Sequence, residues 1–179
     1  MHPEILSIAL FWFVTAYTPG PNNVVASYSG FNFGITRTIP HILGVTLGFT
    51  SLVIFLTIGL INVFKLFPLI QIIIKYLGTL FLIYLAYKIA SSTNSKETKK
   101  ENPVKFIETF LFQYLNPKGV MVAIIVVSTY VELGENYINY ATQVVALAFL
   151  FSSTSITLWT FIGKFLRKFA TNDKFIKYF

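Results

Sequence analysis

Long apolar runs, separated by short polar stretches, dominate the pattern along the chain. Five runs stand out, at about residues 5–28, 39–61, 66–89, 106–131 and 140–163. Each has the roughly 20 residues that a helix needs to cross the hydrocarbon core of a bilayer. Apolar and polar positions do not alternate within the runs, which favours helices over the strands of a membrane barrel. The pattern therefore predicts an all-α integral membrane protein, a polytopic helical bundle with five transmembrane helices.

Charged residues are scarce, and the basic ones gather between the apolar runs. Of the 179 residues, 55% are hydrophobic and 12% are charged, with a formal net charge of +7. Lysines concentrate in residues 91–105 and after residue 163, whereas Glu132 and Glu135 lie in a loop predicted on the opposite side. The positive-inside rule then predicts a cytoplasmic 91–105 linker and an N-terminus outside a bacterial-type inner membrane. This distribution describes membrane topology and argues against a nucleic-acid partner.

The hydrophilic linker at 91–105 divides a single membrane domain, residues 1–179, into two halves. Three predicted helices lie in residues 1–90, which would form the first repeat. Because three is an odd number, a second copy of this unit in residues 106–179 would be inverted in the membrane. That second half has only two apolar runs. The expected architecture is therefore a pair of inverted three-helix repeats in which the second is incomplete and the sixth helix is missing.

Both halves carry a proline-containing interruption in the middle of an apolar run. The first half contains TPGPNN, which comprises Thr18, Pro19, Gly20, Pro21, Asn22 and Asn23. The second half contains Gln113 and, three residues later, Asn116, Pro117 and Lys118. Matched interruptions in two halves are typical of the substrate site of a transporter. The alternative is a pair of structural proline kinks that neighbouring helices accommodate.

The chemistry of proline explains what such a break offers to a solute. Proline lacks an amide hydrogen and clashes with the carbonyl four residues earlier, so the carbonyls of Thr15, Tyr17 and Gln113 should be free. The half-helix after each break begins with unpaired amides and the positive end of its dipole. Acceptors and donors thus lie close together, which suits a zwitterion such as an amino acid.

Lys118 is the most informative single residue, since it lies near the middle of the predicted 106–131 helix. A charge at the bilayer centre costs about 2.5–3.5 kcal/mol on insertion scales, and such residues usually face a polar interior. Lys118 is therefore a candidate to bind a substrate carboxylate or to titrate during transport. The alternative is a structural lysine that donates hydrogen bonds to freed carbonyls across the two breaks.

Other polar and small residues give weaker signals. Glu108 and His41 join Lys118 as candidates for proton coupling, although Glu108 follows Lys105 by one helical turn, which favours a local ion pair. His41 lies near the start of a predicted helix, which favours an interfacial position. Gly44 and Gly48 form a GxxxG pattern that predicts close helix packing. The run SSTS at 152–155 is expected either to line a pathway or to hold helices together.

Enzymatic chemistry finds little support in the sequence. There is no cysteine, a single aspartate at position 173, and only two histidines far apart in sequence. A catalytic site needs a nucleophile with a base, or a metal cluster. The sequence therefore predicts no catalytic residues, no metal and no cofactor, with an amino acid and the lipid bilayer as the partners and a homo-oligomer as a further option.

The ordered set of motifs resembles the LysE/RhtB family of amino-acid exporters over nearly the whole chain. The similarity is carried by Thr18-Pro19-Gly20-Pro21-Asn22, Gly34, Gly44, Gly48, Tyr76-Leu77-Gly78, Tyr84-Leu85, Asn116-Pro117-Lys118, Trp159 and Gly163. The Asn22-Asn23 pair and residues 128–131 are similar to the cysteine and O-acetylserine exporter branch.

This resemblance implies a secondary active transporter that exports amino acids or small derivatives across the inner membrane, coupled to proton entry. It also implies that the two interrupted motifs form the substrate region. One departure is that family members usually have a sixth helix, whereas this chain ends where that helix would begin. The alternative interpretation is therefore a truncated or non-transporting membrane subunit of the same family.

Overall fold

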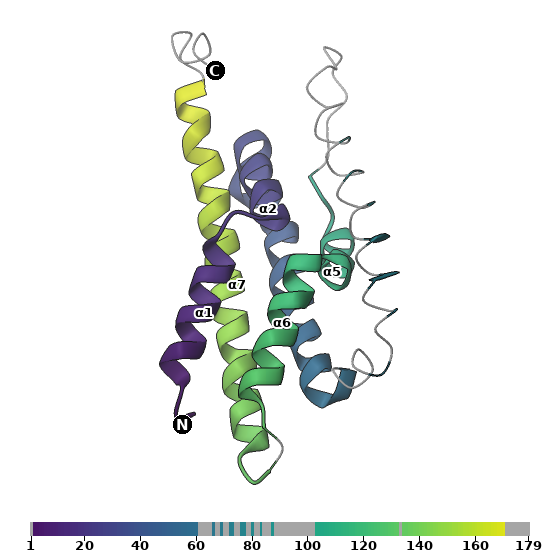
Figure 1. Ribbon diagram of the computed structural model, residues 1–179. Coiled ribbons are helices and arrows are strands. Elements are labelled where there is room, and N and C mark those ends of the chain that lie inside the picture. The colour runs from purple at the N-terminus through teal and green to yellow at the C-terminus, as the bar shows by residue number, and fades with distance from the viewer. Residues whose placement is uncertain are drawn as a thin grey trace.

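The computed structural model describes residues 2–60, 103–132 and 134–170, together with isolated helical positions between 66 and 87. The elements of that part of the chain are α1 (Ile5–Tyr17), α2 (Pro21–Phe55), the π-helical turn η1 (Leu56–Leu60), α5 (Phe106–Leu115), α6 (Pro117–Tyr130) and α7 (Tyr137–Ala170). They form an elongated bundle in which α2 and α7 are the long helices (Figure 1). The predicted all-α class is confirmed for these residues.

Two of the described helices are long and apolar enough to cross a membrane, namely Pro21–Gly59 and Tyr137–Phe169. The α5 and α6 helices meet at a bend of 60° and together make a third candidate span that is broken at its middle. Helix α1 is apolar but has only 13 residues. The predicted helical membrane protein is thus confirmed. The five-helix count and the inverted repeats stay predictions, and most of the predicted 66–89 helix and of the 91–105 linker lies outside the described residues.

The structure differs from the prediction between residues 28 and 39, where the sequence predicts a loop between two helices. Helix α2 continues from Pro21 to Phe55 and contains one non-helical residue, Gly34, with φ 75° and ψ 178°. A positive φ is accessible to glycine because it has no Cβ. The polar residues before position 39 therefore lie in a kinked helix instead of a loop, which a pattern of apolar runs does not reveal.

Small residues allow α2 to approach two neighbouring helices closely. A Cβ added to Gly30 would collide with the backbone of Thr160 in α7. On the other side, a Cβ on Gly44 would lie 2.7 Å from the Phe106 carbonyl oxygen, and one on Gly48 would lie 2.7 Å from the Phe110 oxygen. Membrane helices associate through such small residues, which let backbones come together. The GxxxG residues of α2 thus lie directly against α5.

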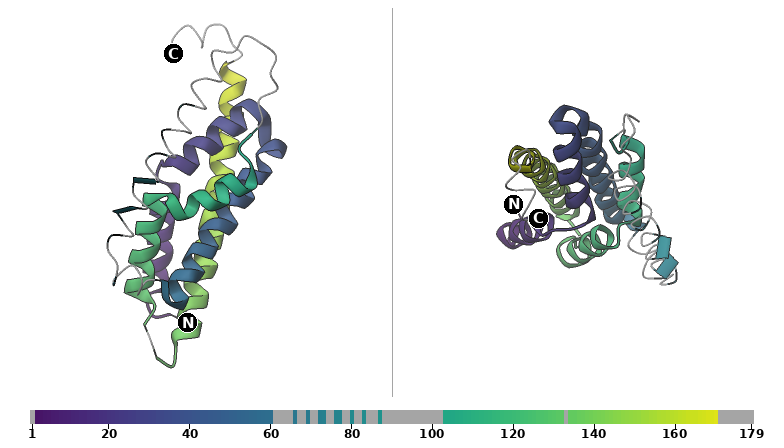
Figure 2. Two further views of the ribbon diagram at one scale, coloured as in Figure 1. Left: turned by 90° about the vertical axis from the view of Figure 1, so that its right-hand side faces the viewer. Right: turned by 90° about the horizontal axis from the view of Figure 1, so that it is seen from above.

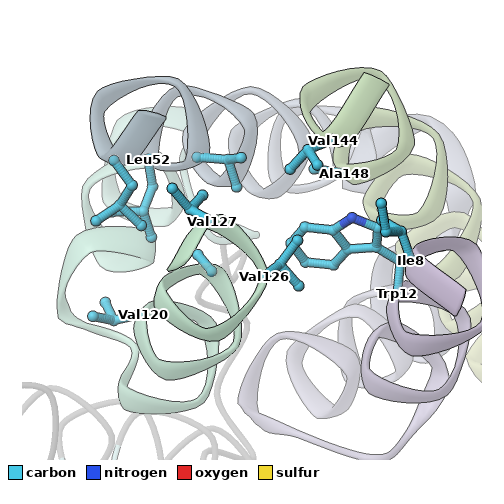
Figure 3. Close-up of a cluster of buried hydrophobic side chains, with 11 residues drawn as sticks. Ile8, Trp12, Leu52, Val120, Val126, Val127, Val144 and Ala148 are labelled. Carbon is cyan, nitrogen blue, oxygen red and sulfur yellow. The ribbon is translucent and has the colours of Figure 1, made fainter. Parts of the chain in front are cut away.

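A cluster of buried apolar side chains joins α1, α2, α6 and α7 (Figure 3). Trp12 from α1 lies among Val126 of α6 and Ala148 of α7, and its ring meets the Phe49 ring edge-on at 5.5 Å. Outside the cluster, large apolar side chains such as Leu6 and Phe161 are exposed, as expected for a surface that contacts lipid. The cluster holds α1 beside α6, as the view from above shows (Figure 2), and a proline break follows α1 and precedes α6.

Candidate functional site

The first break separates α1 from α2. The last helical hydrogen bond of α1 runs from the Thr18 N–H to the Val14 oxygen over 3.1 Å, and Gly20 then adopts an extended conformation. Pro21 is the first residue of α2, a position where its missing N–H costs nothing. A negative helix end and a positive helix start are therefore separated by only three residues.

The second break separates α5 from α6 and has the same construction. Asn116 is the extended residue between the two helices, and its N–H closes α5 on the Phe112 oxygen at 2.8 Å. Pro117 is the first residue of α6. Both proline motifs therefore divide helices in the way that the sequence predicts, each with proline in the first turn of the second part.

Lys118 connects the two breaks. Its Nζ donates to the Thr18 backbone oxygen at 2.7 Å, across 100 residues of sequence. A Cβ on Gly20 would lie 3.1 Å from Nζ, so the absence of a side chain there leaves room for the lysine. A cation at the carboxyl end of α1 is favourable for the helix dipole. The interpretation of Lys118 as a structural lysine predicts this hydrogen bond. Among the described contacts, the bond uses one of the three N–H donors of the ammonium group.

Side chains also hold the exposed carbonyls at the end of α1. Asn23 Nδ2 donates to Ala16 O at 3.1 Å and to Thr18 O at 2.9 Å, and Ser155 Oγ of α7 donates to Ala16 O at 2.8 Å. The sequence predicts free carbonyls at Thr15 and Tyr17. In the structure, the backbone oxygens of Ala16 and Thr18 accept these side-chain hydrogen bonds instead, because α1 ends at Tyr17.

A buried polar network lies on the other side of the first break. Asn22 and Gln113 form a reciprocal amide pair, with Nδ2 to Oε1 at 2.8 Å and Nε2 to Oδ1 at 3.2 Å. Gln113 also donates to the Thr109 oxygen at 2.9 Å. The ring of His41 contacts this network, with Nδ1 3.2 Å from Thr109 Oγ1 and Nε2 3.3 Å from the backbone oxygen of Asn22. The two halves of the chain are thus joined by side-chain amides at their breaks.

A cavity of about 80 Å³ lies between the breaks and is bounded by α1, α2, α6 and α7 as well as by the α5–α6 junction. Such a volume exceeds the roughly 10–15 Å³ that one water needs, so it has room for a small solute. Seven of the residues predicted from the two motifs line it: Gly20, Pro21, Asn22, Asn23, Gln113, Asn116 and Lys118. Thr18, Pro19 and Pro117 shape the breaks without lining the cavity.

Two lining side chains have buried polar atoms without a partner among the described residues. These atoms are Oδ1 of Asn116, whose residue is 3% exposed, and Nε1 of Trp12, which is 1% exposed. Buried polar atoms are nearly always hydrogen-bonded, so an orphaned acceptor at a cavity wall is a place for a ligand or water. Asn116 therefore has a buried acceptor without a partner among the described residues, next to the lysine of the same motif.

The remaining predicted residues lie outside the cavity. Glu108 accepts a hydrogen bond from the Lys105 N–H at 3.3 Å, at the start of α5. The side chain of His41 is 1% exposed and lies inside the bundle, and its interfacial position stays a prediction. Its position near the start of an apolar run does not show which way the side chain faces, and here it points toward α5.

Sequence reasoning missed the walls of the cavity. Trp12, Phe49 and Val122 lie there, but aromatic and aliphatic residues occur throughout these helices and carry no separate signal. Ser152 and Ser155 also line the cavity, which agrees with the pathway interpretation of the SSTS run. Ser155 in addition bonds α1, so the helix-contact interpretation holds for it as well.

Apolar helices broken around a small cavity that carries a few polar groups are typical of a membrane transport protein. Comparison with known proteins agrees, because residues 13–177 match the LysE type translocator family. The chain is 30% identical over 171 residues to the cysteine/O-acetylserine efflux protein of Salmonella typhimurium (strain LT2), with 94% of this chain and 87% of that protein covered. It is 26% identical over 172 residues to the protein of that name in Escherichia coli (strain K12), with the same coverage.

The chain therefore belongs to the LysE type translocator family, and the resemblance predicted from its motifs is confirmed. The relatives also bear the name of the predicted branch. No solved structure showed significant similarity to this one.

Proposed function

We propose that this protein is a secondary active transporter that exports small amino acids or their derivatives across the inner membrane. The observation that carries the proposal is the cavity between two proline breaks, lined by Lys118 and by Asn116, whose buried Oδ1 has no partner among the described residues. The family match over most of the chain supports the same function. The names of the relatives favour cysteine and O-acetylserine as the first substrates to test.

A zwitterion fits the polar groups of this cavity. The substrate carboxylate is placed near the ammonium of Lys118 and the first amides of α2, those of Asn22 and Asn23, which have no partner within the helix. The substrate ammonium is placed at Asn116 Oδ1, because the carbonyls at the end of α1 already accept hydrogen bonds. Ser152 and Ser155 are available to a polar substrate side chain.

Transport requires the cavity to open to each side in turn. The breaks make this feasible, since α1 can move relative to α2, and α5 relative to α6, without loss of regular helical hydrogen bonds. Export against a gradient needs an energy source, and we assign this to proton entry, as the family resemblance implies. The proposed topology has the N-terminus outside and the 91–105 linker in the cytoplasm.

Efflux from cells tests the proposal. Cells that express the chain are loaded with labelled cysteine, O-acetylserine, threonine or lysine, and export is compared with cells that carry an empty vector. We expect faster export of at least one small neutral substrate, abolished when the proton gradient is collapsed. Export that survives collapse of the gradient would indicate a channel. A membrane-inserted chain that exports none of the panel would contradict the proposal and favour the non-transporting subunit.

A further inference from the structure

His41 occupies a buried position between three helical segments. It lies in the part of α2 that follows Gly34, and it bonds Asn22 in the part of α2 that precedes Gly34. Its other ring nitrogen bonds Thr109 of α5. The residue thus links both sides of the α2 kink to the second half of the chain, one bond away from the amide pair of the cavity.

The partners of the ring restrict how its protons are arranged. The Asn22 oxygen can only accept, so His41 Nε2 carries a proton and donates to it. Thr109 Oγ1 can both donate and accept, and it also lies 3.1 Å from the Lys105 oxygen. In the neutral imidazole, Nδ1 accepts the Thr109 hydroxyl proton. In the imidazolium, Nδ1–H donates to Oγ1, and the hydroxyl turns to donate to Lys105 O.

The site therefore keeps every hydrogen bond of the ring in both protonation states. A buried charge is costly unless it is paired and hydrogen-bonded, and the ring of His41 meets the hydrogen-bonding part of this condition in both protonation states. Here a single hydroxyl rotation accommodates the added proton. The geometry points to His41 as the proton-binding site of this transporter, with Thr109 as the residue that positions its proton, an inference that rests on the proposed function.

The charged groups on the surrounding elements are few. Arg37 lies on α2, Lys105 precedes α5 and Glu108 lies in its first turn, Lys118 lies on α6, and α7 carries Lys164, Arg167 and Lys168. The ring nitrogens of His41 bond a hydroxyl and a carbonyl, which are neutral. Lys118 is engaged with Thr18 as a helix cap, and the Glu108 carboxylate accepts the Lys105 amide. His41 is the candidate whose ring nitrogens can keep their hydrogen bonds in both protonation states.

The bond to Asn22 provides a physical link between proton and substrate. When Nδ1 takes up a proton from the outside, the Nε2–H bond to the Asn22 oxygen becomes charge-assisted and stronger. Asn22 is in the first turn of α2, and its side chain lines the cavity. Release of the proton to the cytoplasm restores the neutral ring and the weaker bond. One proton enters for each cycle, and the ring is unchanged at the end.

Reconstituted protein separates this inference from the proposed function. Wild-type protein in proteoliposomes should exchange labelled O-acetylserine or cysteine without a gradient and should accumulate it when a pH gradient is imposed. His41→Gln keeps one donor and one acceptor but cannot take up the proton. We expect it to retain exchange and to lose accumulation driven by the gradient. His2→Gln, which changes the other histidine of the chain, should behave as wild type.

Thr109 provides the second test. Thr109→Ser keeps the hydroxyl and should retain gradient-driven accumulation, whereas Thr109→Val leaves the protonated ring without its acceptor. We expect Thr109→Val to move the pH profile of accumulation toward acidic pH by about one unit. Full gradient-driven accumulation by His41→Gln would overturn the inference while leaving the transporter intact. A wild-type protein that exchanges neither substrate would overturn the proposed function, and the inference with it.

Discussion

The Lys118 ammonium lies 2.7 Å from the backbone oxygen of Thr18, so a cation at the second break caps the C-terminal end of α1 at the first break. Asn23 donates to the same oxygen at 2.9 Å. The contact explains how a lysine is tolerated at the break of an apolar span, since it faces the end of α1 with its exposed carbonyls. It also places a cation at the wall of the cavity that we propose as the substrate site.

Removal of this charge should affect both folding and transport. In Lys118→Met the Thr18 oxygen loses a charged donor, and we expect a loss of about 1–2 kcal/mol of stability. Substrate exchange should fall to background, because the carboxylate loses its cation. Thermal unfolding in detergent measures the first effect, and exchange by variant protein that elutes as wild type measures the second. Normal exchange by Lys118→Met would restrict the lysine to its structural role.

Loss of the Asn116 amide should weaken substrate binding without destabilising the protein. Asn116→Leu removes a buried oxygen that lacks a partner, so we expect stability to stay unchanged or to rise by about 1 kcal/mol. The apparent affinity for substrate should fall, because the proposed acceptor for the ammonium is gone. Substrate-dependent thermal stabilisation compares both quantities in one experiment. A variant that is destabilised yet binds substrate normally would show that the oxygen serves the fold.

The glycines of α2 should be intolerant of even one methyl group. In Gly44→Ala the Cβ would meet the Phe106 oxygen at 2.7 Å, which forces α2 away from α5 at a cost of about 1–3 kcal/mol. Gly119→Ala in α6 is the matched control, since its nearest contacts are at 3.6 Å, and it should be nearly neutral. Thermal unfolding of the two variants measures the difference. Equal stability would show that α2 and α5 are not in backbone contact.

The cysteine-free sequence allows a direct test of topology. Single cysteines at Ser95, in the linker, and at Glu135, in the loop before α7, should lie on opposite sides of the membrane. An impermeant maleimide added to intact cells should label Glu135→Cys and spare Ser95→Cys until the cells are opened. The reverse labelling would place the N-terminus in the cytoplasm, and equal labelling would contradict the predicted number of spans between the two positions.

The breaks were predictable because proline has a single, local effect on a helix. Pro21 and Pro117 each begin a new helix in the structure, and seven residues of the two motifs meet at one cavity. The position of His41 was not predictable in the same way. An apolar helix in a membrane has few polar positions to mark its buried face, so the sequence could not show that this side chain turns toward Thr109.

Two further features depend on tertiary contacts. The continuation of α2 through the predicted loop depends on Gly34, and a glycine in a polar stretch is equally compatible with a loop. The wall formed by Trp12 and Phe49 becomes visible only in the folded bundle, where the two rings from α1 and α2 meet. The sequence therefore located the polar half of the site, and the structure was needed for the apolar half.

In the proposed mechanism, the substrate occupies the cavity between the two breaks. A cysteine at Ser152, which lines the cavity, can be labelled with a maleimide in reconstituted protein, and Ser128→Cys on the exposed face of α6 serves as the control. We predict that saturating O-acetylserine slows labelling at position 152 and leaves position 128 unaffected. Unchanged labelling at position 152, in protein that still exchanges O-acetylserine, would show that the substrate binds elsewhere.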